Sequence, residues 1–462
     1  MERIAEFWDD AIVPSLVEYI KIPAKSPHFD KAWEKNGHIE AAVTLAEAWC
    51  RKHAVSGMKL EVVRLAGRTP VLFMEIEGKT QGTVLMYGHL DKQPEMTGWR
   101  EGFGPWLPKI VDGKLYGRGG ADDGYAVFCA LAAIRHLQEQ KISFANIKIL
   151  IECCEESGSF DLPAYLEFLS PRIQAPDLVI GLDSGCGNYD QLWGTTSLRG
   201  LVNGVLSVEV LTEGVHSGDA SGIVAESFRI QRELLDRIDD ADTGVVHHAA
   251  FHAPIPPERG EQAKRAAKVL GKEIWRKFPF VEGMQPMAED LDDLVLNRTW
   301  RPALAVTGAE GLPLPANAGN VLRPKTALAL SLRLPPTIRG DVAARNLKTL
   351  LEADPPCGAR VSFEFNHAAS GWHAPPTAAW LEKIIDESSR AHYGKPAMWM
   401  GEGGTIPFMA MLGDKFPKAQ FLITGVLGPH ANAHGPNEFL HIGYAKKLTA
   451  CVADVIAAQA KK

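Results

Sequence analysis

The sequence predicts an α/β fold interrupted by an inserted α+β domain, because its hydrophobic pattern changes twice along the chain. Before about Gly194, short continuous apolar runs indicate strands that are buried on both faces of a sheet. After Gly194 the strand-like segments alternate, which indicates sheets with one face in water. Around Ser370 the first pattern returns. A chain of 462 residues also exceeds the size at which single cores usually stop growing, so two domains are expected.

The expected strands of the first domain each lead to a potential metal ligand. The pairs are residues 83–87 with His89, residues 147–154 with Glu155 and Glu156, and residues 177–182 with Asp183. A helix is expected over 125–138, directly after Asp122 and Asp123. In open α/β sheets, ligands bind outside the carboxyl ends of the strands. The placement of these side chains therefore predicts one shared site.

The inserted domain is expected to contain alternating strands and amphipathic helices. The strands are expected over 201–211, 326–334 and 361–365, and the helices over 225–237 and 342–351. Residues 238–312 show few regular periods apart from a helix around 262–278. After the insertion, a helix over 378–392 and a strand over 421–425 lead to His434. The predicted boundaries are 1–197 and 369–462 for the first domain and 198–368 for the inserted one.

Composition excludes several classes of protein. Hydrophobic residues make up 46% of the chain and charged residues 23%, and the formal charge of −7 is spread along it, which does not fit binding to nucleic acid or an anionic membrane. The N-terminus lacks the pattern of a signal peptide and no apolar run is long enough to span a bilayer, so a cytoplasmic location is expected. The seven cysteines, with Cys153 and Cys154 adjacent, are expected to be reduced, buried thiols.

The residues at the strand ends form the inventory of a two-metal hydrolytic site. They supply two histidines and three carboxylates, with a spare glutamate, drawn from His89, Asp122, the Glu155-Glu156 pair, Asp183 and His434. In such sites a shared carboxylate holds the ions about 3.5–4 Å apart and a bridging water becomes the nucleophile. Taken singly, an Asp or His in a loop is more often a turn former or a solvated side chain. The ordered set at strand ends favours the metal site.

Six segments also resemble, in order, the motifs of a known enzyme family. The segments are 89–91, 117–123, 155–159, Asp183, 402–407 and 434–438. They look like those of the zinc exopeptidases, the family of aminoacylases, carnosinase-type dipeptidases and succinyl-diaminopimelate desuccinylase. The long inserted domain makes the chain most similar to the carnosinase-type dipeptidases. The resemblance implies a catalytic domain with a mixed, mostly parallel sheet flanked by helices, plus an inserted α+β lid/dimerisation domain.

The resemblance implies a role for each metal-site residue. Asp122 would bridge both metals, His89 and Asp183 would complete one shell, and Glu156 and His434 the other. Glu155 would act as the general base and later pass a proton to the leaving amine. Asp91 would accept the second imidazole N–H of His89 and fix its tautomer. Relatives hold the peptide bond after the bridging aspartate in the cis form, so a cis Asp122-Asp123 bond is expected.

The resemblance also implies residues that contact the substrate. His216 would reach the active site of a neighbouring subunit in a homodimer and stabilise the oxyanion. Arg333 would bind the carboxylate of the substrate, for which a guanidinium fork is well suited. Further substrate contacts are expected from Asn320 and from the segment Gly403, Gly404 and Thr405. One departure is Gly401, because carnosinase-type dipeptidases commonly have arginine at this position.

Together these features predict a dinuclear metal-dependent dipeptidase or exopeptidase that hydrolyses an amide bond next to a free carboxylate. The expected cofactors are two divalent ions per chain, zinc or alternatively manganese or cobalt. The expected partners are a small peptide or N-acyl amino acid and a second copy of the chain, with no nucleic acid and no membrane. An N-acyl-amino-acid deacylase with the same machinery is the alternative enzyme. A catalytically dead metal-binding regulatory protein is the alternative of another class.

Overall fold

The chain divides into two compact units in the computed structural model, which describes residues 1–462 except the side chain of Pro407. Unit 1 comprises Met1–Thr196, Ala374–Met400 and Pro407–Lys462, and unit 2 comprises Ser197–His373 and Gly401–Ile406. Two strands, β8 (Trp193–Leu198) and β16 (Met398–Glu402), run across boundaries between these ranges. The second unit is thus an insertion into the first, as the two changes of pattern predict.

Unit 1 is built on a six-stranded mixed sheet with the order β1-β2-β6-β3-β7-β17. The strands are β1 (Met58–Val63), β2 (Val71–Ile76), β3 (Thr80–His89), β6 (Ala145–Glu152), β7 (Leu178–Gly181) and β17 (Gln420–Ile423). Strands β6, β3, β7 and β17 pair in parallel, whereas β1 and β2 are antiparallel to their neighbours. This arrangement confirms the predicted mixed, mostly parallel sheet.

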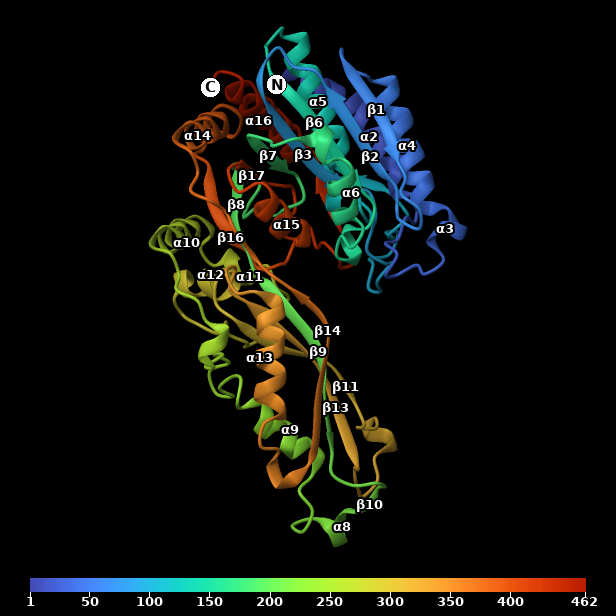
Figure 1. Ribbon diagram of the computed structural model, residues 1–462, viewed down its shortest axis with the longest axis vertical. Helices are drawn as coiled ribbons and strands as arrows, with labels where there is room; N and C mark the ends of the chain where they lie inside the picture. Colours follow the sequence, from blue (N-terminus) through green and yellow to red (C-terminus); the bar gives the residue numbers. More distant parts are fainter. The chain divides into compact units, whose positions relative to one another are not determined.

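Helices flank the sheet of unit 1 (Figure 1). They are α1 (Glu2–Phe7), α2 (Val13–Ile20), α3 (Trp33–Asn36), α4 (His38–Lys52), α5 (Tyr125–Glu139), α6 (Leu162–Phe168), α7 (Ser170–Ile173), α14 (Ala379–Tyr393), α15 (Pro407–Lys415) and α16 (Ile442–Gln459). Helix α5 packs on β3 and β6 and is itself covered by α1, α4 and α16. Its residues from Tyr125 to Ile134 are all buried, because small alanines let the neighbouring helices approach closely. A small sheet of β4 (Lys109–Val111), β5 (Lys114–Tyr116) and β18 (Phe439–His441) completes the unit.

Unit 2 is an α+β unit with a four-stranded antiparallel sheet of order β11-β13-β9-β14. The strands are β11 (Ala303–Glu310), β13 (Lys325–Leu334), β9 (Gly200–Glu209) and β14 (Arg360–Ala369). Helices α9 (Ser227–Leu235) and α13 (Gly340–Glu352) pack on one face of this sheet and share its apolar core (Figure 1). The remaining elements are β10 (Val215–His216), α8 (Ser217–Ala220), α10 (Pro257–Leu270), α11 (Glu273–Arg276), α12 (Leu291–Thr299), β12 (Val321–Leu322) and β15 (Trp372–His373).

Several expected elements are corrected by the structure. The single helix expected around 262–278 is two helices, because Gly271 has a φ of +55° that no helix interior adopts and it separates α10 from α11. Strand β11 was not expected, since most of its side chains are exposed on both faces and give no alternation. Cys357 is exposed, against the expectation that all thiols are buried, although the other six are buried.

No helix among the described residues combines the length and apolar character needed to cross a membrane.

Candidate metal centre

Two groups of potential ligands lie together in unit 1 and share one carboxylate. His89, Asp122 and Asp183 form one group, and Asp122, Glu156 and His434 form the other, with the ligand atoms of each group within 4.8 Å of one another. His89 Nε2 lies 3.4 Å from Asp122 Oδ1 and 3.9 Å from Asp183 Oδ2. His434 Nε2 lies 3.1 Å from Asp122 Oδ2 and 3.3 Å from Glu156 Oε2. The five side chains expected to bind metal are thus brought together, with Asp122 between the groups.

The sheet explains how three of these ligands meet. His89 is the last residue of β3, and strands β6 and β7 pair in parallel on its two sides. The residues that follow β6 and β7, Glu156 and Asp183, therefore emerge at the same sheet edge as His89. Asp122 comes from the short segment Gly120–Gly124 that leads into α5, and His434 comes from the loop after β17. The expected cis Asp122-Asp123 peptide bond is present. Asp123 Oδ2 accepts a hydrogen bond from the main-chain N–H of His89 at 3.3 Å, which ties the Asp122 loop to the end of β3.

Asp91 contacts both the His89 ring and the turn that follows β6. His89 Nδ1 lies 3.0 Å from the main-chain oxygen of Asp91 and 3.5 Å from its carboxylate. The carboxylate also accepts the main-chain N–H groups of Glu155 at 3.1 Å and Glu156 at 3.0 Å. Asp91 therefore orients the His89 ring through its main-chain oxygen and its carboxylate, and the same carboxylate fixes the turn that carries both glutamates.

Burial and mutual repulsion raise the pKa values of most carboxyl groups in this cluster. Burial and the charge of Asp122 raise the pKa of Glu156 to about 8, and burial raises that of Asp183 to about 6. Burial, followed by the charge of Asp183, raises the pKa of Glu155 well above its usual value. Asp122 is the exception, because burial is outweighed by the two histidines, which lower its pKa far below the usual value.

The histidines show that the cluster attracts positive charge. Burial lowers the pKa of His434, but Glu156 and Asp122 raise it to about 10 overall. Burial also lowers the pKa of His89, but Asp122 and other carboxylates raise it well above the usual value. In addition, His89 Nε2 and Glu156 Oε1 are buried without a hydrogen-bond partner among the described residues. A cluster of imidazole and carboxylate donors with a strongly negative potential fits divalent cations.

A buried ion pair that the sequence analysis missed joins two of the ligand loops. Arg118 Nη1 lies 2.5 Å from Glu438 Oε2, and both side chains are almost fully buried. Arg118 also donates to the main-chain oxygen of Gly435 at 2.7 Å, and Glu438 Oε1 accepts from Gly119 N at 2.9 Å. The pair therefore ties the loop before Asp122 to the loop after His434. Both residues lie inside the motif segments 117–123 and 434–438, but nothing in either segment indicates that they pair.

Arg118→Met is expected to weaken binding of divalent metal by about 10–100-fold, as loss of groups that orient metal ligands does. The effect should be larger at the His434 group, because the Arg118–Glu438 pair holds the segment that follows His434. Zn²⁺ titration by calorimetry measures it, with Arg135→Met as the matched control, since Arg135 pairs with Glu139 on the surface of α5. Unchanged affinity at both groups would show that the ion pair only supports the fold.

The predicted substrate residues lie in unit 2 in two separate places. Arg333 Nη1 lies 3.2 Å from Thr405 Oγ1, so the structure brings the expected carboxylate-binding arginine and the 402–407 segment together. His216 ends β10 and Asn320 directly precedes β12, which pairs antiparallel with β10, and Ser217 N donates to Asn320 O at 2.9 Å. Both of these side chains are exposed.

The atoms around position 401 explain why this residue is glycine and not arginine. A Cβ atom at Gly401 would lie 2.4 Å from Ser197 Oγ and 2.9 Å from Thr299 Cβ, so no side chain fits there. A guanidinium near the neighbouring Glu402 comes instead from α12, where Arg298 Nη2 lies 3.8 Å from Glu402 Oε2. Arg199, which the sequence analysis also missed, donates to the main-chain oxygen of Gly403 at 3.2 Å. Two arginines thus fix the segment that carries Gly403, Gly404 and Thr405.

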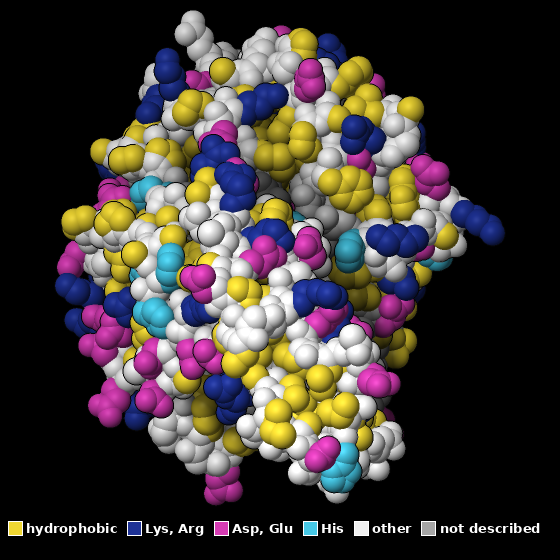
Figure 2. All heavy atoms as spheres, turned by 60° about the horizontal axis from the view of Figure 1, so that its bottom comes forward, with side chains coloured by type: hydrophobic (Ala, Val, Ile, Leu, Met, Phe, Trp, Pro, Cys, Tyr) yellow, Lys and Arg dark blue, Asp and Glu magenta, His cyan; other side chains and the backbone are white. Residues whose placement is uncertain are grey.

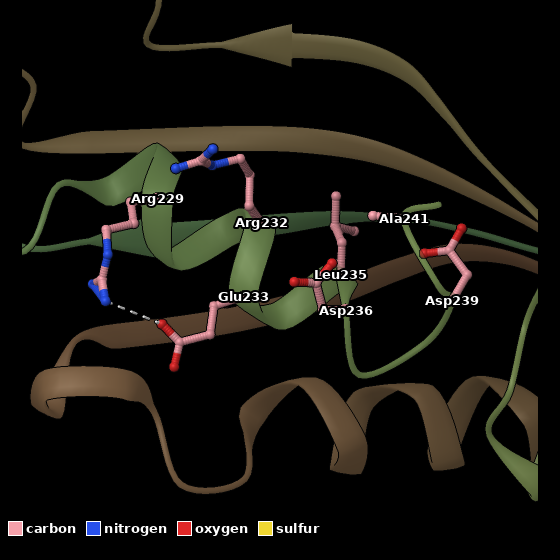
Figure 3. Close-up of a pocket in the computed structure, with 7 residues that line it drawn as sticks. All are labelled: Arg229, Arg232, Glu233, Leu235, Asp236, Asp239 and Ala241. Atoms are coloured by element: carbon pink, nitrogen blue, oxygen red, sulfur yellow. Dashed lines mark ion pairs between the residues drawn. The ribbon is translucent and has the colours of Figure 1, made fainter. Parts of the chain in front are cut away.

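A separate pocket of about 470 Å³ along α9 contains none of the predicted site residues (Figure 3). Its charged side chains have both signs, and Arg229 and Glu233 form an ion pair at 3.8 Å across one turn of the helix. Because these charges largely balance, we assign no function to this pocket, which is lined by α9 and the loop that follows it.

Comparison with known proteins identifies the family. Residues 85–458 match peptidase family M20/M25/M40, so the chain belongs to this family of peptidases. It is 29% identical over 454 residues to the Beta-Ala-His dipeptidase of Homo sapiens, covering 92% of this chain and 86% of the relative. It is 27% identical over 376 residues to the cysteinylglycine-S-conjugate dipeptidase of Corynebacterium striatum, covering 79% of each.

Solved structures share the fold. The crystal structure of human carnosine dipeptidase 1 matches with a TM-score of 0.78 at 21% identity, covering 100% of this chain and 99% of that one. The dipeptidase Dug1p from Saccharomyces cerevisiae matches with a TM-score of 0.77 at 19% identity, covering 100% and 98%. These matches confirm the predicted fold class.

Proposed function

We propose that the protein is a dinuclear metal-dependent dipeptidase that hydrolyses an amide bond next to a free carboxylate. The observation that carries the proposal is the pair of ligand groups that share Asp122, with Glu155 directly beside the ligand Glu156. The family match and the dipeptidase names of the relatives support it.

Each residue of the centre has a chemical task in this proposal. His89 and Asp183 would hold one divalent ion, Glu156 and His434 the other, and Asp122 both. Such ions polarise a scissile carbonyl and lower the pKa of water from 15.7 to about 7. Glu155 would take the proton from the attacking water and give one to the leaving amine.

In unit 2, Arg333 with Thr405 would bind the substrate carboxylate, since a guanidinium matches the two oxygens of that group. Gly403, Gly404 and Asn320 would add contacts to the rest of the substrate. Zinc as the metal, a cytoplasmic location and the domain limits 1–197, 198–368 and 369–462 remain part of the proposal.

A comparison of paired substrates tests the reaction class. A dipeptide with a free amine should be hydrolysed at least about tenfold more efficiently than its N-acetylated analogue, a difference of about 1.4 kcal/mol in transition-state binding. The reverse preference would favour the N-acyl-amino-acid deacylase. Absence of turnover across a broad dipeptide panel, with metal bound, would favour the regulatory metal-binding protein.

We also propose that the protein is a homodimer formed through unit 2. Strand β11 is an edge strand whose side chains are mostly exposed, and such edges invite pairing with another chain. Large apolar side chains are exposed on the same unit, including Ile223 at 84%, Leu314 at 72% and Val306 at 48%. In Figure 2 the end of unit 2 that carries β10 is turned toward the reader, and hydrophobic side chains gather on this end. A second copy of the chain would cover them.

In this dimer His216 would act in the active site of the partner. His216→Ala should lower kcat by about 10²–10³-fold, as loss of an oxyanion donor does. Mixing His216→Ala with Glu155→Gln should restore up to about half the wild-type activity per heterodimer, because one of its two sites then holds both intact residues. Activity after subunit exchange measures this, with each variant alone as control. If exchange is demonstrated and no activity returns, His216 does not act in trans.

A further inference from the structure

A cavity of about 1,020 Å³ lies within unit 2 and contains none of the metal ligands. Its wall is formed largely by α11, α12 and the loops beside them. Apolar side chains line it, among them Trp275, Phe278, Met287 and Trp300. Phe278 is 48% and Met287 71% exposed, whereas Trp300 is 2% exposed. Exposed apolar side chains beside a pocket of this size are typical of a ligand site.

Guanidinium groups from Arg199, Arg298 and Arg301 also line this cavity. Arg301 Nη2 lies 2.8 Å from Asp293 Oδ1, so the carboxylate neutralises the charge of this guanidinium. Arg199 is 9% exposed, and among the described residues its hydrogen bonds go to main-chain oxygens, those of Gly403, Asn297 and Arg301. Burial, together with the charges of Arg333 and Arg298, lowers the pKa of Arg199 to about 9. Arg298 Nη2 lies 3.8 Å from Glu402 Oε2, whereas Arg199 forms no ion pair with a carboxylate among the described residues. The Arg199 end of the cavity therefore carries positive charge that an anion would stabilise.

We propose that this cavity binds an organic carboxylate with an aromatic or large aliphatic body. The body would lie on Trp275 and Phe278, and the carboxylate would face Arg199 and Arg298. The wall and the charge are both needed, because the apolar surface provides burial and the guanidinium groups provide charge-assisted hydrogen bonds.

The same arginines connect the cavity to the substrate segment. Arg199 binds the main chain of Gly403, and Arg298 lies beside Glu402. The carboxylate could therefore have two sources. One is the C-terminal residue of a peptide substrate, a reading that rests on the proposed dipeptidase function. The other is a separate small molecule that acts on this segment.

Direct binding to the full-length protein tests the proposal without any assay of activity. Calorimetry should show saturable binding of one 1-naphthoate per chain. The uncharged 1-naphthamide and the small anion acetate should each bind at least about tenfold more weakly. Naphthamide lacks the carboxylate, and acetate lacks the aromatic body. Absence of saturable naphthoate binding, or equal binding of naphthamide, would overturn the proposal.

Two variants place the bound probe in this cavity. Phe278→Ser and Arg298→Gln should each weaken naphthoate binding by about tenfold or more. The matched controls are Phe168→Ser, at a ring 56% exposed on α6 of unit 1, and Arg360→Gln, at a side chain 83% exposed on β14. Circular dichroism verifies that each variant is folded. Wild-type affinity in both cavity variants would overturn the proposal.

Kinetics then separate the two sources. If the substrate supplies the carboxylate, naphthoate should inhibit competitively, and Phe278→Ser should raise KM for a dipeptide ending in Trp but not for one ending in Gly. If a separate molecule supplies it, naphthoate should change kcat without competing. Either result would support the proposal that the cavity binds an organic carboxylate. An enzyme inactive on all dipeptides would count against the proposed function, while the binding result would still decide the proposal for the cavity.

Discussion

Glu155→Gln is expected to lower kcat by about 10²–10⁴-fold, the usual contribution of a positioned general base. Glutamine has nearly the same shape as glutamate but cannot accept a proton from water. The main-chain N–H of Glu155 donates to Asp91 at 3.1 Å, and this bond is retained in the variant, so the turn should keep its form. Metal binding should be preserved, because Glu156 and not Glu155 belongs to the ligand groups.

The measurement for Glu155→Gln combines steady-state kinetics with metal analysis of the same sample. Glu167→Gln, an exposed position on α6, is the matched control and should keep wild-type kcat. Near-normal kcat in Glu155→Gln with metal bound would mean that another group takes the proton from water.

Much of the metal centre was predictable because three of its ligands end or closely follow strands of one sheet. His89, Glu156 and Asp183 each follow a recognisable apolar strand, and the three strands β6, β3 and β7 are neighbours in the sheet. The sequence cannot show that neighbour order by itself, but any parallel arrangement places these strand ends on one edge. Asp122 and His434 were included as potential ligands from their places before the helix over 125–138 and after the strand over 421–425, but only the resemblance to a family implied their separate roles.

Features that depend on contacts between distant segments were not predictable. The Arg118–Glu438 pair joins residues 320 positions apart, and neither residue carries a local pattern that indicates its partner. Asp91 lies against the His89 ring, but its carboxylate also binds the turn after β6, 64 positions away at Glu155, and no local pattern indicates this second contact. Strand β11 was not predicted, because a strand exposed on both faces lacks the alternation of polar and apolar residues that burial of one face imposes.

Asp122→Ala is expected to weaken metal binding at both groups and to abolish measurable hydrolysis. Asp122 Oδ1 faces His89 and Oδ2 faces His434, so the carboxylate is common to both groups. Loss of groups that merely orient a ligand costs about 10–100-fold in metal affinity, and loss of a shared ligand should cost more than this at each group. His434→Ala should weaken mainly one group, because His434 belongs to one group alone.

Metal analysis after equilibrium dialysis distinguishes these outcomes. The wild type should hold two divalent ions per chain, lose activity on chelation and regain it when metal is restored. Asp10→Ala, at an exposed position near the N-terminus, is the control and should match the wild type. Two tightly bound ions in Asp122→Ala would contradict the shared ligand, since a carboxylate that both groups need cannot be removed without loss from both.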